Sequence, residues 1–361
     1  MAEVPDAAGR VDLVRERLDP RTLLLTALVV IAALYTLRVA RELLIPIAVA
    51  LLLNFLLSPA VRALRRLRIP EPVGAALVLL ALLSTVSAVS YNLAAPAADW
   101  VSRAPETLAE VRAKFAPLRR PVEQMSRAAE QVEDAAAMRG SRTPEVEIAG
   151  PTLVKKIFGG TLAMLGFVTV VGFLAFFLLA GGDRFLQKLI RVLPQLRDKK
   201  KAVSIAREIE SQVSVHMVTT TAINVGVGAA TALAVWLCGM PNAPLWGLVA
   251  GILNYVPYLG AMATVAVLGM AALVTFDTIG RALLVPGTFV LINLLEAHIV
   301  TPLVLGSRLR LNTVALFVGM MFWWYVWGIP GALMAVPMMA TIKIICDHFE
   351  ELSPLAEFLG T

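Results

Sequence analysis

Charged residues are scarce in this chain of 361 residues, and that scarcity excludes a water-soluble globule. Only 16% of the residues are Asp, Glu, Lys or Arg, whereas soluble domains carry about 25%. Hydrophobic residues make up 58%, the mean hydropathy is +0.77, and apolar runs long enough to cross a bilayer recur. These runs are continuous and do not alternate with polar residues, which excludes a transmembrane β-barrel. We therefore predict an all-α, polytopic bundle of membrane helices.

Cysteine and the motifs of soluble enzymes are also nearly absent. The only cysteines, Cys238 and Cys346, lie in apolar surroundings without the spacing of a metal site or a redox pair. The chain contains no P-loop, no dinucleotide-binding glycine motif, no HExxH and no CxxC. We therefore expect a protein that is not an enzyme, has no cofactor or metal, and does not hydrolyse ATP to drive transport.

The basic residues account for the net charge of +6, and they cluster at the ends of apolar runs. Arg62, Arg65, Arg66 and Arg68 follow the second run, and Lys199–Lys201 precede the fifth. This pattern orients membrane proteins, so it argues for the lipid bilayer as a partner and against nucleic acid. The positive-inside rule places both clusters in the cytoplasm, and counting spans from them places both termini there too.

Hydropathy predicts about eight transmembrane helices in three regions. Residues 1–94 hold a polar tail and three spans. Residues 95–156 form a polar extracytoplasmic insertion, which we predict to be two amphipathic helices separated at Pro121. Residues 157–361 hold the transport bundle, with a cytoplasmic amphipathic stretch at 182–212. The predicted spans are residues 22–37, 43–59, 72–93, 157–179, 213–237, 279–299, 314–327 and 330–345.

Residues 245–275 predict a broken helix that enters the membrane and returns to the same side. Leu245–Leu253 is too short to cross about 30 Å of hydrocarbon at about 1.5 Å per residue. Pro257 removes a backbone donor, and Gly260 permits a conformation that other residues resist. Half-helices joined at such a break build solute and ion sites in many transporters. The residues predicted to line a transport pathway here are Asn254, Tyr255, Pro257, Tyr258 and Gly260.

Glu296 is the one acidic residue in the predicted span at 279–299. A charge at mid-helix costs about 2.5–3.5 kcal/mol on insertion scales, so this side chain is expected to face the bundle interior. On a regular helix Asn293 shares its face and His298 does not. We interpret Glu296 as a site for a proton or a cation. With it, the predicted pathway continues through Asn293, Glu296, Thr301 and Pro302.

Each of these residues also has a structural interpretation. Glu296 and Asn254 are equally suited to hydrogen-bond backbone groups that the break frees. Tyr255 and Tyr258 are typical of the aromatic belt at a membrane–water interface. The glycines and prolines that predict structural turns and kinks further along are Gly306, Gly328, Pro330, Gly331 and Pro337.

Several apolar motifs follow one another in a specific order along nearly the whole chain. They are Leu44–Pro46 through Pro59 with the arginine cluster, Phe176–Arg184, Asn254–Gly260, Glu296 with Thr301-Pro302 and Gly306, and Gly328–Gly331 with Ala335-Val336-Pro337. Each motif alone is weak, but together they resemble the autoinducer-2 exporter family of bacterial permeases. Ala261 and Thr313 depart from the family pattern, because proline is frequent at both positions.

The resemblance implies an inner-membrane permease of about eight spans that assembles as a homo-oligomer. It implies export of a small polar solute such as autoinducer-2. Other members are described as sodium(lithium)/proton antiporters, so an antiporter in which Glu296 binds Na⁺ and H⁺ in turn is the alternative. A structural membrane oligomer without transport is a third class, since a fold does not determine a function.

Overall fold

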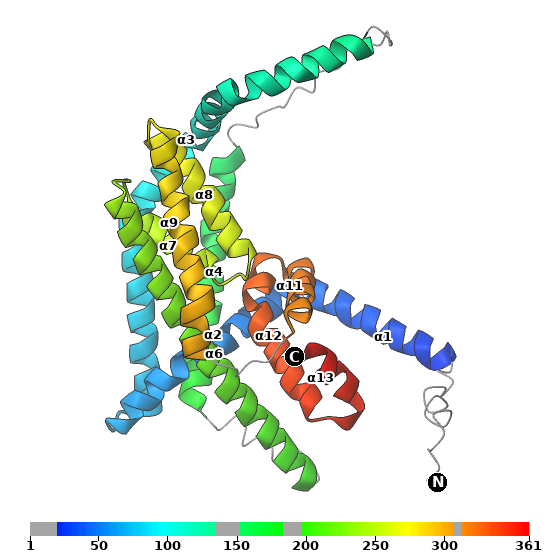
Figure 1. The fold of residues 1–361 in the computed structure, drawn as a ribbon. Helices are drawn as coiled ribbons and strands as arrows, with labels where there is room; N and C mark the ends of the chain where they lie inside the picture. The colour runs from blue at the N-terminus through cyan, green and yellow to red at the C-terminus, as the bar shows by residue number, and fades with distance from the viewer. Residues whose placement is uncertain (1–19, 135–151, 183–195, 306–311, 361) are drawn as a thin grey trace, which may run out of the picture.

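The computed structural model describes residues 20–134, 152–182, 196–305 and 312–360, which form helices and contain no strand (Figure 1). This confirms the predicted all-α fold. The helices are α1 (Pro20–Val39), α2 (Arg41–Arg66), α3 (Glu71–Asp134), α4 (Thr152–Gly181), α6 (Leu196–Leu237), α7 (Ala243–Leu253), α8 (Leu259–Thr275), α9 (Ile279–Leu295), η3 (Glu296–Val300), α10 (Thr301–Leu305), α11 (Thr313–Trp327), α12 (Ile329–Asp347), η4 (Glu350–Leu352) and α13 (Ser353–Leu359).

Six helices in the described part of the chain are long and apolar enough to cross a membrane, and each contains most or all of a predicted span. The other two predicted spans, 22–37 and 314–327, correspond to the shorter apolar helices Leu24–Val39 and Thr313–Trp327. Helix α11 has 15 residues and is therefore about 23 Å long, less than a hydrocarbon core of about 30 Å. The six longer helices comprise residues 41–66, 71–103, 164–181, 199–237, 279–304 and 329–347.

Two helices are longer than the sequence predicted. Helix α3 runs without interruption to Asp134, so the predicted separation at Pro121 is wrong, and the third span continues into residues 95–134 of the insertion as one helix. Helix α6 begins at Leu196, so residues 196–212 of the predicted amphipathic stretch and the fifth span form one helix. Hydropathy detects where a chain becomes polar, but a helix continues past that point while its residues favour helix, and both extensions are rich in such residues. Residues 135–151 and 183–195 of these segments lie outside the described residues.

Three apolar clusters form the interior of the bundle. One joins α6, α7, α8 and α9, and Trp100 of α3 packs against it. A second joins α11 and α12 with parts of α1 and α2, and a third joins α2, α3 and α4. Helix α6 packs against α7, α2, α9 and α12. A polar side chain on α6 therefore reaches several neighbouring helices.

Helices α7 and α8 form the re-entrant hairpin that the sequence predicted. Helix α7 runs antiparallel to α6, and α8 returns antiparallel to α7, so the outer ends of both short helices lie at the same end of the bundle (Figure 1). At the opposite end, Arg62 on α2 pairs with Glu210 on α6. The arginine cluster and the start of α6, which carries the lysine cluster, therefore lie at one end of the bundle, as the charge pattern predicts.

Candidate functional site

The backbone at the helix break is strained. Helix α7 ends at Leu253 and α8 begins at Leu259. Tyr258 has φ 60° and ψ −55°, and the Leu259 N–H donates to the Pro257 carbonyl at 2.6 Å. Together these make a γ-turn of the rare, positive-φ type, which places Tyr258 in a region that non-glycine residues seldom occupy. Such strain persists only where the surrounding packing holds it, and it is concentrated at functional sites.

Gly260 allows the two halves of the broken helix to touch. A Cβ at this position would overlap the carbonyl oxygen of Leu253 and would lie 2.6 Å from the carbonyl carbon. The prediction that Gly260 supplies an unusual backbone conformation is therefore wrong: the unusual φ belongs to Tyr258, and Gly260 supplies space. The buried Thr264 hydroxyl donates to the Gly260 carbonyl one turn earlier at 2.8 Å, so this buried donor is satisfied within α8.

Three asparagines from three helices meet at this break. The Asn254 Nδ2 donates to Asn224 Oδ1 of α6 at 2.9 Å, and the Asn293 Nδ2 of α9 donates to Asn254 Oδ1 at 3.3 Å. Both ends of the Asn254 amide are therefore occupied by side chains of neighbouring helices. Asn224 is 3% exposed, and its own Nδ2 has no hydrogen-bond partner among the described residues. The asparagine cluster thus holds one buried donor that is available to a ligand.

A second polar contact joins α6 to the break one turn away. The Tyr255 hydroxyl donates to Thr221 Oγ1 at 2.8 Å. Thr221 and Asn224 are three residues apart, so they share a face of α6. The structure thereby brings Asn254, Tyr255 and Asn293 together with two α6 residues that the sequence analysis did not include in the pathway. The unusual polarity of the span at 213–237 points to Thr221 and Asn224 as candidates. Polarity alone does not reveal which face of the helix a partner occupies.

Glycines bring α6 and α7 close enough for these contacts. A Cβ on Gly228 would lie 2.8 Å from the Gly247 carbonyl oxygen, and a Cβ on Gly251 would lie 2.9 Å from the Asn224 carbonyl oxygen. Gly247 and Gly251 are four residues apart, the small-residue spacing at which membrane helices approach closely. That spacing is visible in the sequence and would have identified the interface.

The contrast between two neighbouring glycines of α6 tests this interface. Gly228→Ala is expected to destabilise the fold by about 1–3 kcal/mol, because the added methyl meets backbone that cannot move aside. Gly226→Ala is the matched control, since nothing lies within 4 Å of its Cβ position and alanine favours helix by up to about 1 kcal/mol. Thermal unfolding of the purified protein in detergent measures both. Equal midpoints for the two variants would contradict the close approach.

Glu296 lies in a π-turn, not in a regular α-helix. The Thr301 N–H donates to the Glu296 carbonyl five residues earlier, and the Thr301 hydroxyl donates to Glu296 Oε1. Pro302 explains the wider turn, because it has no N–H and its ring would clash with the carbonyl of His298 in a regular helix. The half-buried Glu296 carboxylate therefore has a partner of its own, and no hydrogen bond joins it to Asn293 or Asn254 in the described structure.

The remaining residues of the predicted pathway and turns lie apart from this cluster. Tyr258 and Pro302 have exposed side chains. Gly328 separates α11 from α12 with φ 66°, and a Cβ on Gly331 would overlap the carbonyl oxygen of Trp323. Pro330 lies in the first turn of α12 and Pro337 lies inside it, whereas Gly306 lies outside the described residues.

A family model described as AI-2E family transporter matches residues 24–351, which include the helix break, the asparagine cluster and the π-turn. The chain belongs to this family. The AI-2E match confirms the resemblance inferred from the ordered motifs. It also identifies the chain as a multi-pass membrane protein of a transporter family.

Relatives of the AI-2E protein are known from several bacteria. "Putative transport protein YhhT" of Escherichia coli K12 is 25% identical over 338 residues, 93% of each chain. "Putative transport protein MT0215" of Mycobacterium tuberculosis is 26% identical over 330 residues, 86% of this chain and 84% of its own. "AI-2 transport protein TqsA" of Escherichia coli K12 is 33% identical over 145 residues, 40% of this chain and 42% of its own. The likeness to the relative that is named for a solute thus covers less than half of the chain.

Proposed function

We propose that this AI-2E family protein is a permease for a small polar solute and that the solute passes the helix break between α7 and α8. The unpartnered Nδ2 of Asn224 carries the proposal, because a buried amide donor without a partner costs about 1–3 kcal/mol and a passing acceptor would relieve that cost. The proline at position 257 and the strained γ-turn at Tyr258 interrupt the helix shortly after Asn254, the residue that hydrogen-bonds to Asn224.

Autoinducer-2 is the first solute to test, because TqsA is named for its transport. The energy source is the gradient of the solute itself or of a coupled ion, because the sequence contains no ATP-binding motif. We place the protein in the bacterial inner membrane as a homo-oligomer with both termini in the cytoplasm. The positive-inside rule supports that orientation.

Antiport of Na⁺ or Li⁺ against H⁺ is the second candidate, and the half-buried Glu296 carboxylate is the observation that favours it. The carboxylate is half-buried in a π-turn, and the Thr301 hydroxyl orients one of its oxygens. A π-turn within a membrane helix is frequently found at a functional site. Among the described residues no three His, Cys, Asp or Glu side chains are grouped so that they could hold a metal ion, so Glu296 is the single carboxylate of this candidate.

Reconstituted vesicles distinguish the candidates in one experiment. The lumen holds autoinducer-2 in one set of vesicles and a pH-sensitive dye in the other, and Na⁺ or Li⁺ is added outside. The permease predicts release of the solute with no change of lumenal pH. A pH response that Glu296→Gln abolishes would establish antiport instead. If the protein elutes as an intact oligomer and the vesicles show neither solute release nor a pH response, both the permease and the antiporter are overturned. A structural role then remains.

Substitutions of Glu296 test what the carboxylate contributes to solute flux. Glu296→Gln is expected to retain flux to within about twofold, because the amide oxygen still accepts the Thr301 hydroxyl. Glu296→Ala is expected to lower flux about tenfold, since losing a hydrogen bond to a charged group costs about 1.5–3 kcal/mol. Initial rates of solute release from vesicles with matched protein content measure both. A loss of flux in the Gln variant equal to that in the Ala variant would show that the charge itself is required.

A further inference from the structure

A cavity of about 570 Å³ lies between α2, α4 and α6 at the arginine-rich end of the bundle, away from the helix break. Leu51 and Phe55 of α2 and Leu174 and Phe177 of α4 supply apolar walls. A volume of this size accepts a small organic molecule. The cavity thus offers room for a solute at the end of the bundle remote from the asparagine cluster.

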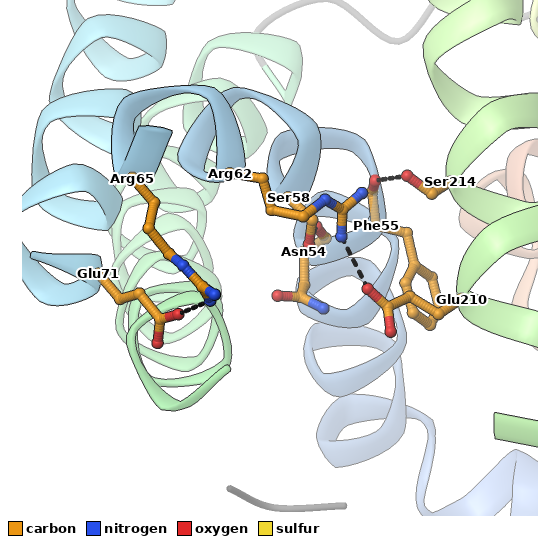
Figure 2. Close-up of polar contacts among 8 residues, drawn as sticks. All are labelled: Asn54, Phe55, Ser58, Arg62, Arg65, Glu71, Glu210 and Ser214. Carbon is orange, nitrogen blue, oxygen red and sulfur yellow. Dashed lines mark hydrogen bonds and ion pairs between the residues drawn. The ribbon is translucent and has the colours of Figure 1, made fainter. Parts of the chain in front are cut away.

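One face of α2 presents polar groups to the cavity. Asn54, Ser58 and Arg62 follow one another at intervals of four residues, so they lie above one another on the same helix face, and Figure 2 shows them side by side. The Ser58 hydroxyl donates to the Asn54 backbone carbonyl at 2.6 Å, which fixes its position. The Asn54 side-chain amide is half-buried and has no partner among the described residues. Its donor and its acceptor are both available to a bound molecule.

The charges that border the cavity are balanced. Arg62 Nη1 pairs with Glu210 Oε1 of α6 at 2.8 Å, and Arg65 Nη1 pairs with Glu71 Oε1 of α3 at 2.6 Å (Figure 2). Two guanidinium groups therefore face two carboxylates. Each pair uses a single N–H and a single oxygen, which leaves further donors and acceptors on all four side chains.

We propose that this cavity is a second binding site, which takes a small polar solute of zero net charge. A neutral solute hydrogen-bonds to the Asn54 amide and to the unused donors and acceptors without breaking either ion pair. An anion or a cation adds an uncompensated charge to a site whose charges already cancel, so the site favours a neutral solute. The apolar walls then contact the carbon skeleton of the solute.

The site rests on the proposed transport function, and α6 connects it to the helix break. Glu210 borders the cavity, and Ser214 one turn further donates to the Phe55 carbonyl at 2.6 Å. Asn224 follows ten residues later, about 15 Å along the same helix. Glu210, Ser214 and Asn224 lie on one side of α6, so a solute held at Asn54 of α2 is next to the same side of α6 that carries the asparagine cluster further along.

Protection of an engineered thiol tests the site. Cys238→Ala and Cys346→Ala remove both native thiols, and Ser58→Cys places one reporter in the cavity beside the intact Asn54. The rate of modification by N-ethylmaleimide is measured with D-ribose or autoinducer-2 as neutral probes, and with butyrate or butylammonium as charged probes. A neutral probe is expected to slow modification by up to about threefold at twice its dissociation constant, and the charged probes are expected to have no effect.

Two controls make the result specific to the cavity. Ser102→Cys, an exposed position of α3 outside the cavity, is expected to react at the same rate with and without each probe. Adding Asn54→Ala to the Ser58→Cys protein is expected to remove the protection and leave the rate without probe unchanged. An unreactive thiol at position 58, no protection by any probe, or protection by a charged probe alone would overturn the proposal. Binding is measured apart from flux, so protection without transport would refute only the proposed function, and transport without protection would refute only this site.

Discussion

Replacing Gly260 with alanine is expected to prevent the hairpin of α7 and α8 from closing. The added methyl would overlap the Leu253 carbonyl oxygen and would come within 2.6 Å of its carbon. Both atoms belong to backbone, so no rotation of a side chain relieves the clash. Overpacking of a membrane or soluble core costs about 1–3 kcal/mol and occasionally more, and the backbone contact places this variant at or above about 3 kcal/mol. Thermal unfolding of the purified protein in detergent measures the loss of stability.

The expected effect extends to function, because the clash lies between the two halves that position the break. Gly260→Ala is expected to abolish solute release from vesicles even where some protein folds. Gly269→Ala on the same helix is the matched control, since the nearest atom to its Cβ position is Pro286 Cγ at 4.0 Å. A Gly260→Ala protein that melts and transports like Gly269→Ala would show that α7 and α8 do not meet as described.

Replacing Asn254 with alanine is expected to disconnect the asparagine cluster and to stop transport. The substitution leaves the Asn224 Oδ1 and the Asn293 Nδ2 without the partner that each has in the structure. Each buried polar group that loses its partner costs about 1–3 kcal/mol. The Asn224 side chain, which is 3% exposed, also loses the hydrogen bond that orients its free donor. The rate of solute release is therefore expected to fall at least about tenfold, since about 1.4 kcal/mol corresponds to that factor.

A control substitution outside the asparagine cluster separates the loss of the cluster from the loss of any asparagine side chain. Asn92→Ala removes an exposed asparagine of α3 whose Nδ2 donates only to the Ala88 carbonyl of its own helix at 2.7 Å. Its solute release is expected to match that of the unmodified protein. The effects of Asn254→Ala and Asn293→Ala on solute release are expected to be less than additive in the double variant, because both substitutions break the same hydrogen-bond network. Normal release by Asn254→Ala at normal protein content would remove the asparagine cluster from the pathway.

Much of the fold was predictable because a bilayer restricts what a chain can do. Every backbone N–H and C=O must be satisfied within the segment that crosses, so long apolar runs become helices whatever surrounds them. Pro257 in a short apolar run likewise predicts a break, since proline cannot continue the hydrogen-bond ladder. Hydropathy did not predict how far α3 and α6 extend beyond their spans, because outside the hydrocarbon a helix no longer depends on it. Helix α3 continues to Asp134 and α6 begins at Leu196.

The candidate site was predictable only in part. Asn254 and Asn293 stand out as polar residues in apolar runs, and the structure joins them at 3.3 Å. Asn224 is equally polar, but its position at the centre depends on the close approach of α6 and α7 through Gly228 and Gly251. Glu296 was expected to share a face with Asn293 on a regular helix. In the structure the Glu296 carboxylate has a partner across the π-turn before Pro302, the Thr301 hydroxyl.

The sequence by itself determined the class of the protein, the position of most spans, the re-entrant break and the family, because each of these follows from local composition or from the order of local motifs. Only the tertiary structure decided which polar groups meet, why Gly260 must be glycine, and where a cavity remains between α2, α4 and α6. Those outcomes depend on contacts between residues far apart in the chain. Backbone surfaces and side-chain volumes set such contacts, and a local pattern such as the Gly247/Gly251 spacing indicates a close interface without specifying which side chains meet there.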